Sequence, residues 1–134
     1  MRVSDVDKGN YYRGLLVLAR RDRILDLRER ELMLKFGATL DFDRRFCQGA
    51  IDDLMENRHI SDEPVTFAER TTAEQFLRDG IELAFSDEAI HTREHSWLLA
   101  VARANGLTNQ WLEAEIHRYM ERKDLPCAPA PNLT

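Results

Sequence analysis

Hydrophobic and polar residues follow one another with a helical period along almost the whole chain. Apolar side chains recur three and four positions apart in six stretches, which begin at Tyr12, Met33, Phe46, Phe76, Trp97 and Leu112. No stretch shows the sustained alternation of apolar and polar residues, rich in β-branched side chains, that is typical of a strand. The sequence therefore predicts an all-α fold, a single domain of about six helices.

Capping signals predict where some of these helices begin and end. The segments Asp26–Glu29 and Thr71–Glu74 have the form of a capping box, in which an oxygen-bearing side chain precedes a glutamate by three positions. Asn105 and Gly106 form a pair suited to the left-handed conformation that ends a helix. Gly80, inside the fourth stretch, is expected at a position of close helix packing.

The breaks in the pattern set the expected boundaries of the domain. Residues 1–9 form an N-terminal segment, and residues 10–123 carry the helical pattern. The longest internal break covers residues 57–70 and contains Pro64. Residues 124–134 hold three prolines and are predicted to be a disordered tail.

The chain also repeats itself at one fixed offset, which places Leu18 on Leu83 and Met55 on Met120. At this offset LARRDRILDLRERELMLKF lies on LAFSDEAIHTREHSWLLAV without a gap. A fixed offset held over three helices is typical of a duplicated structural unit. The sequence therefore predicts two three-helix repeats, residues 10–56 and 71–121, joined by the loop 57–70.

Charge and composition narrow the range of partners. A formal net charge of −5 argues against a globally basic nucleic-acid-binding surface, and the arginines between residues 20 and 30 fit a solvated helix face. No apolar run approaches the ~20 residues that cross a bilayer, and the first residues lack the apolar core of a secretory signal. Cys47 and Cys127 form no CxxC motif. We therefore expect a cytoplasmic protein with neither a nucleic-acid nor a membrane partner.

The stretch HTREH, residues 91–95, matches the H-x-x-E-H motif of one class of zinc peptidase. Such an enzyme needs both histidines on one face of a formed helix, with the glutamate as general base. The repeat places HTREH on DLRER, so that His91 stands where Asp26 begins a helix and Glu94 stands where Glu29 completes a capping box. This placement disfavours a peptidase.

The histidines and the carboxylates that follow them are expected in ordinary positions. His91 is predicted at a helix boundary, where the backbone is not yet helical, and His95 on the surface. Glu113 and Glu115 fit helix-surface positions by pattern. The sequence also lacks a nucleophile elbow and a phosphate-binding glycine loop, so no other catalytic chemistry is indicated.

Both repeats share the pattern A-x-x-D-x-x-(L/I)-x-x-x-E where one helix ends and the next begins. The two copies are Ala19, Asp22, Leu25 and Glu29, then Ala84, Asp87, Ile90 and Glu94. One interpretation is structural, because Asp can fix a turn and Glu can cap the next helix. The other is functional, because two carboxylates that meet at a corner offer the oxygen ligands preferred by a hard divalent cation. The pattern leaves both interpretations open.

This shared pattern resembles the A-D-G-x-(apolar)-x-x-x-E signature of the TerB-like domains of tellurite-resistance proteins, which also occur in a membrane-anchored DnaJ-like co-chaperone. The resemblance covers about residues 10–121, with Arg23 and Glu88 where the signature has glycine. It implies an all-helical, internally duplicated fold, a role in metal or chemical stress, and acidic sites that bind metal ions; it does not imply an enzyme. Carried over to this chain, the metal-ligating residues are Asp22, Glu29, Asp87 and Glu94, with Asp26 and His91 as neighbours.

Two functions remain open at this point. The first is a non-enzymatic TerB-like module whose acidic corners bind a divalent cation, the one cofactor under consideration. The alternative is a protein-interaction or scaffold domain in which the acidic pairs are only helix caps. This alternative predicts a homodimer or an unidentified protein partner, and an exposed apolar patch for which Tyr11, Trp97 and Trp111 are candidates.

Overall fold

The computed structural model describes residues 3–19, 27–56, 60–85 and 90–125. Six helices and no strand occur in these ranges, which confirms the predicted all-α fold. The helices are α1 (Asp5–Ala19), α2 (Leu27–Thr39), α3 (Arg44–Glu56), α4 (Arg70–Ala84), α5 (Thr92–Ala104) and α6 (Asn109–Arg122). Helix α1 begins at Asp5, so part of the expected N-terminal segment is helical.

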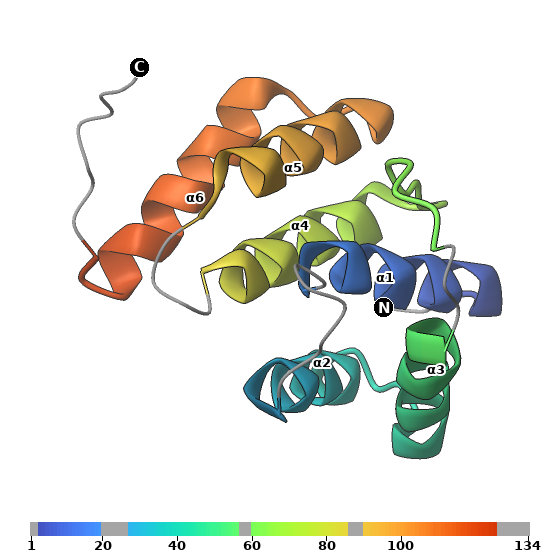
Figure 1. Cartoon of the computed structure of the whole chain (residues 1–134). Coiled ribbons are helices and arrows are strands. Elements are labelled where there is room, and N and C mark those ends of the chain that lie inside the picture. Colours follow the sequence, from blue (N-terminus) through green and yellow to red (C-terminus); the bar gives the residue numbers. More distant parts are fainter. Residues whose placement is uncertain (1–2, 20–26, 57–59, 86–89, 126–134) are drawn as a thin grey trace.

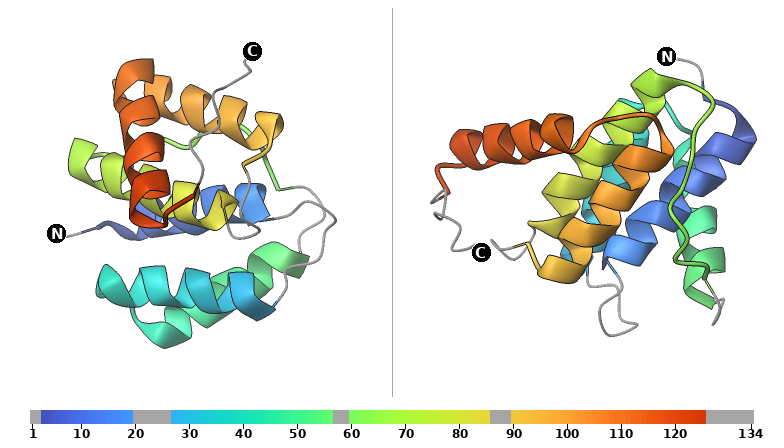
Figure 2. Two further views of the ribbon diagram at one scale, coloured as in Figure 1. Left: turned by 90° about the vertical axis from the view of Figure 1, so that its left-hand side faces the viewer. Right: turned by 90° about the horizontal axis from the view of Figure 1, so that it is seen from above.

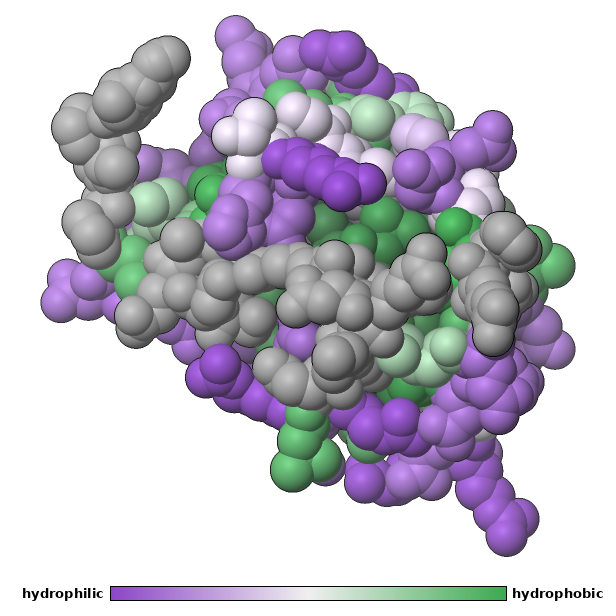
Figure 3. Space-filling model, in the orientation of Figure 1, coloured by the Kyte–Doolittle hydropathy of each residue, from purple (hydrophilic) through white to green (hydrophobic). Residues whose placement is uncertain are grey.

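The helices pack in three layers (Figures 1 and 2). Helices α1 and α4 contact each other along the middle of the molecule. Helices α2 and α3 pack against α1 on one side of this pair, and α5 and α6 pack against α4 on the other. Hydrophilic residues cover much of the face seen in Figure 3, and smaller hydrophobic areas are visible between them. The central pair therefore connects the two outer layers.

Aromatic rings and close backbone approach make the contact between α1 and α4. The rings of Tyr11 and Phe76 meet edge to face with their centroids 5.2 Å apart, an arrangement that suits their quadrupoles. Gly14 leaves room for the Phe76 ring, because a Cβ at residue 14 would lie 2.5 Å from its Cζ atom. Gly80 likewise lets Leu18 approach α4, which confirms the close-packing position expected for this glycine.

Helix α4 starts earlier than its capping signal predicts. Its N-cap residue is Glu69, whose side chain makes no capping hydrogen bond. Thr71 therefore lies in the first turn, and the prediction that it opens a capping box is wrong. The reason is tertiary packing, because Thr72 and Ala73 are buried against the core and the Ala73 amide already donates to the Glu69 carbonyl.

Helix α5 ends as predicted. Asn105 is its C-cap residue, and Gly106 follows with a φ of 78°. The Leu107 amide donates to the Ala102 carbonyl at 2.8 Å, which closes the last turn in the Schellman geometry. Helix α2 ends in the same way, with Asp41 at a φ of 61° in the left-handed position.

The connecting segment, residues 60–69, is attached to α1 through its main chain. The Arg13 guanidinium donates from Nη1 to the carbonyl oxygens of Ser61 at 2.7 Å and Glu63 at 3.0 Å. The carboxylate of Asp7 accepts a hydrogen bond from the Ala68 amide at 3.1 Å. This irregular segment therefore follows α1 and is not a loose linker.

The same connecting segment is also attached to α5 and its C-cap. The indole nitrogen of Trp97 donates to the Asp62 carbonyl at 2.7 Å. The Asn105 side chain accepts from the Phe67 amide and donates to the Val65 carbonyl, both at 2.9 Å. These bonds satisfy backbone groups that a helix or sheet would otherwise pair.

Gly37 lets α2 close on a buried tyrosine of α1. The Tyr12 hydroxyl donates to the Met33 carbonyl at 3.1 Å and lies 2.9 Å from Sγ of Cys47. A Cβ on residue 37 would overlap that hydroxyl oxygen and lie 2.5 Å from the thiol sulfur. Tyr12, Met33 and Cys47 are all buried, so they have little room to move aside.

The substitution Gly37→Ala is expected to lower the free energy of unfolding by about 1–3 kcal/mol, because overpacking displaces buried side chains. Gly49→Ala in α3 is the matched control, since nothing lies within 4 Å of a Cβ built there. That control is expected to stabilise the helix by up to about 1 kcal/mol. Urea denaturation followed by circular dichroism measures both changes. A Gly37→Ala protein as stable as the wild type would contradict the close packing at this residue.

Candidate functional site

The first of the two predicted acidic corners is described in part. Glu29 lies in the first turn of α2, which begins at Leu27, and its side chain is half-buried. Asp22 and Asp26 lie outside the described residues. The convergence of these carboxylates on a metal ion therefore stays a prediction.

The second acidic corner is described on its α5 side. His91 is the N-cap residue of α5 and has extended backbone, with φ −87° and ψ 153°, as its alignment with Asp26 predicts. Its N–H donates to Oε1 of Glu94 at 3.0 Å, so Glu94 acts as the glutamate of a capping box. Asp87 lies outside the described residues, and its approach to Glu94 stays a prediction.

The two histidines of HTREH do not share a helix face. His91 precedes the helix, whereas His95 lies within it and contacts α6, where its Nε2 is 2.5 Å from Oε1 of Glu113. In the described ranges, no three or more His, Cys, Asp or Glu side chains converge in a way that would hold a metal ion. Glu113 is exposed as predicted, and its contact with His95 links α5 to α6.

A buried carboxyl that the sequence pattern did not predict lies at the centre of the molecule. Asp79 of α4 is 7% exposed. Its Oδ2 accepts a hydrogen bond from the Tyr11 hydroxyl of α1 at 2.5 Å, and its Oδ1 accepts one from the Gln75 side chain at 3.0 Å. Both oxygens are therefore bonded, which offsets part of the cost of burial. Tyr11 is a core residue, which corrects its candidacy for a surface patch.

Burial raises the pKa of Asp79 to about 6, and the negative charge of Glu82 adds to the increase. The hydrogen bonds from Tyr11 and Gln75 and the positive charge of Lys35 lower the pKa of Asp79 in opposition. Burial also raises the pKa of the Tyr11 hydroxyl, as does the charge of Asp79. The proton therefore stays on Tyr11, and its hydroxyl is the donor of the pair.

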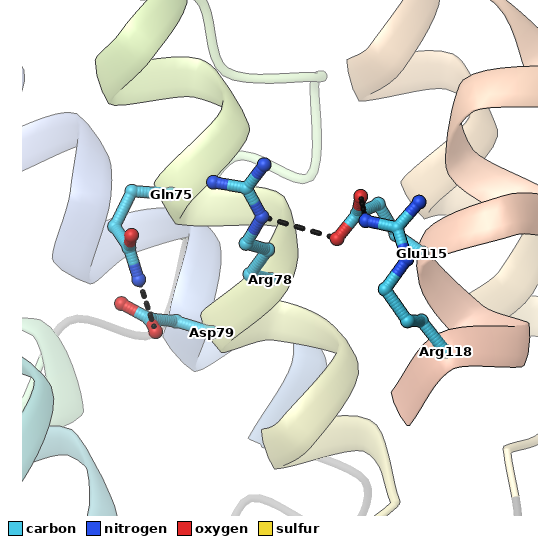
Figure 4. A network of polar contacts seen from close by, with 5 residues as sticks. All are labelled: Gln75, Arg78, Asp79, Glu115 and Arg118. Carbon is cyan, nitrogen blue, oxygen red and sulfur yellow. Dashed lines mark hydrogen bonds and ion pairs between the residues drawn. The ribbon is translucent and has the colours of Figure 1, made fainter. Parts of the chain in front are cut away.

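A second buried carboxylate lies between α4 and α6 (Figure 4). Glu115 accepts a hydrogen bond from Nε of Arg78 at 3.0 Å and another from Nη1 of Arg118 at 2.6 Å. Glu115 is 8% exposed, so the expectation that it is a surface residue is wrong, because its side chain turns toward α4. The Arg78 guanidinium also lies 5.6 Å from the centre of the half-buried Trp111 ring, within cation–π range. Two arginines thus share one buried carboxylate.

The sequence contains a weak signal for the burial of Asp79 and Glu115. Asp79 follows Phe76 by three positions and precedes Leu83 by four, so it lies on the apolar stripe of α4. Glu115 stands in the same relation to two apolar residues of α6. A polar residue on such a stripe is either at the helix edge or buried with a bonding partner, and the pattern alone does not distinguish the two cases.

No relative of this chain was found among known proteins. Comparisons of the chain with protein-family models, with curated proteins and with solved structures find no match. Among the helices of the described ranges, none has both the length and the apolar character of a membrane span. The likeness to TerB-like domains therefore depends on the repeated acidic pattern of the sequence.

The raised pKa of Asp79 predicts that one contribution to stability depends on pH. The pKa of this carboxyl rises from 3.8 to about 6 on folding, so in that window the folded protein holds a proton that the unfolded chain releases. Raising the pH through the window therefore lowers the free energy of unfolding, by about 1.4 kcal/mol for each unit of pKa difference.

The substitution Asp79→Asn keeps a neutral hydrogen-bonding side chain and removes this titration. The free energy of unfolding of the wild type falls between about pH 4 and pH 6, and that of the variant does not. The variant minus wild-type difference is therefore expected to increase by on the order of 2–3 kcal/mol over this range. Asp53→Asn, which removes an exposed charge from α3, controls for the change in net charge. Denaturant titrations at a series of pH values give the comparison. A difference between Asp79→Asn and the wild type that does not change with pH would contradict the prediction.

Proposed function

We propose that this chain is a non-enzymatic helical module of the TerB-like type that acts by binding a protein partner. The observation that carries the proposal is the hydrogen bond from the His91 N–H to Glu94, at 3.0 Å. It gives Glu94 a capping role, which favours an interaction or scaffold domain over an ion site. Asp79 and Glu115 are likewise engaged in contacts inside the fold. These buried carboxylates therefore support no catalytic role.

The positions of the helices support the proposed duplication of a three-helix unit. The offset that places Leu18 on Leu83 also places both ends of α1 on those of α4, both ends of α2 on those of α5, and the start of α3 on that of α6. Capping contacts follow the same offset, because Asp43 accepts from the Phe46 amide at 3.1 Å and Thr108 accepts from the Trp111 amide at 3.0 Å. A duplicated helical unit of this kind is what the TerB-like resemblance implies.

The surface supports partner binding because it leaves apolar side chains available. Val6 and Leu27 are the large hydrophobic residues most exposed in the described ranges, each at 74%. Trp97 and Trp111 are half-buried, and Figure 3 shows hydrophobic areas between hydrophilic residues. The partner is a second copy of the chain or another protein, and the cytoplasmic location and the role in metal or chemical stress belong to the same proposal.

A photo-crosslinking amino acid placed on the outer helices tests partner binding. Gln48 of α3, Ser96 of α5 and Gln110 of α6 are exposed positions for it. In intact cells we expect one discrete cross-linked product from one of these faces, because a specific interface covers only part of the surface. The remaining positions serve as internal controls. Absence of a product at all three, together with a monomer by light scattering, would contradict the proposal.

A second candidate function is divalent-cation binding at the acidic corners. It is favoured by the repeated placement of a glutamate, since Glu29 and Glu94 are each the third residue of their helices, α2 and α5. An aspartate stands seven positions before each of them, Asp22 and Asp87. Carboxylate oxygens are the ligands that Ca²⁺ and Mn²⁺ prefer.

Two substitutions of Glu94 separate a cap from an ion ligand. Glu94→Gln keeps an acceptor for the His91 N–H and removes the charge, so stability is expected to stay within about 0.5 kcal/mol of the wild type's. Glu94→Ala removes the acceptor and is expected to lower the free energy of unfolding by about 1 kcal/mol. An ion site predicts that both variants, and Asp87→Ala, bind Ca²⁺, Zn²⁺ or Mn²⁺ more weakly than the wild type in calorimetric titration. No binding, or equal binding by all four proteins, would exclude the corner site.

A further inference from the structure

Arg13 of α1 already holds a peptide segment by its main chain. Its Nη1 atom donates to the carbonyl oxygens of Ser61 at 2.7 Å and Glu63 at 3.0 Å. A guanidinium suits this task because its several N–H groups reach more than one acceptor from a planar, rigid head. The face of α1 beside Arg13 is therefore occupied by the connecting segment, residues 60–69.

Arg78 has the corresponding position in α4. It is the ninth residue of its helix, as Arg13 is of α1. Its Nε donates to Glu115, and in Figure 4 neither of its two terminal nitrogens is bonded to the residues drawn. No described residue accepts a hydrogen bond from these nitrogens, and the side chain is 44% exposed. The described part of the chain therefore leaves this guanidinium with donors for a further ligand.

Arg78 shares its carboxylate partner with a second arginine. Arg78 and Arg118 both donate to Glu115, which is 8% exposed. One carboxylate balances only one of the two guanidinium groups, so this cluster of three side chains carries one positive charge. At the corresponding positions of the proposed first repeat, α3 has Ala50 in place of the glutamate and Asp53 in place of the second arginine. The arrangement of two arginines on one glutamate therefore occurs in the second proposed repeat and not in the first.

We propose that the face formed by Arg78, Trp111 and Arg118 binds an acidic peptide segment of a partner protein. The guanidinium groups donate to its carbonyl and carboxylate oxygens, and the Trp111 ring contacts its apolar side chains. The inference rests on the proposed function as an interaction module and specifies the chemistry of the partner. Residues 126–134 of this chain, PCAPAPNLT, contain no Asp or Glu side chain to complement the two arginines.

The test uses a fluorescent synthetic peptide with the sequence of residues 60–67, ISDEPVTF, because the face beside Arg13 already binds this segment. Its fluorescence anisotropy is measured as the full chain is added. We expect saturable binding that weakens with added salt and that Arg78→Gln and Arg118→Gln each weaken about tenfold. Arg70→Gln is the matched control, since Arg70 is an exposed arginine of the same helix that pairs with Glu74, and it should leave binding unchanged.

Variants of the peptide and of the protein test the same interaction independently. A peptide with Asp62→Asn and Glu63→Gln is expected to bind the wild-type chain about tenfold more weakly, a result that does not depend on the folding of any variant. Circular dichroism confirms that the protein variants are folded. Absence of saturable binding at millimolar protein, equal binding of the neutral peptide, or weakening by Arg13→Gln but not by Arg78→Gln would overturn the proposal. If the peptide fails to bind while a cross-linked partner is found, the site assignment fails and the proposed function stands.

Discussion

The crossing of α1 and α4 is the contact on which the rest of the fold depends. Two pairs of residues meet there, since the Tyr11 side chain reaches Asp79 and the Phe76 ring lies against Gly14. Helices α2 and α3 attach to α1, and α5 and α6 attach to α4. A change that opens the crossing would therefore weaken the connection between the outer layers, which otherwise depends on the contact of α2 with α4 and on the connecting segment. Burial of its aromatic rings stabilises the whole domain.

The two pairs at this crossing differ in polarity although their members occupy corresponding positions in the two proposed repeats. Tyr11 corresponds to Phe76, and Gly14 corresponds to Asp79. In the proposed duplication, one copy of the contact pairs the Tyr11 hydroxyl with the Asp79 carboxyl. The other copy places the Phe76 ring against Gly14. If two first halves were paired, each Tyr11 hydroxyl would face Gly14 without a buried acceptor, which is costly. The difference in polarity therefore favours the pairing of unlike halves.

Local patterns predict the parts of this structure that depend on neighbouring residues. The helical period of apolar residues predicts the six helices, and Gly106 predicts the end of α5. The internal repeat predicts the capping role of Glu94, which is the described part of the second acidic corner. Contacts between distant residues escape such patterns. The capping signal predicts that α4 starts at Thr71. The observed N-cap is Glu69, because burial of the first residues extends the helix. The pattern does not predict that Asp79 and Glu115 are buried, because the partners that bond them across the core, Tyr11 and Arg78, stand 68 and 37 residues away.

The connecting segment joins the central pair of helices to an outer layer, which limits where new chain ends can be introduced. Its main chain is bonded to Arg13 of α1 and to Trp97 and Asn105 at α5, and Val65 within it is buried. New chain ends are usually tolerated in exposed loops with few bonds. A circular permutation opened between α3 and α4 would instead cut a segment that ties the central pair to an outer layer. The joint between the two proposed repeats is therefore part of the architecture, and termini introduced there would weaken both halves at once.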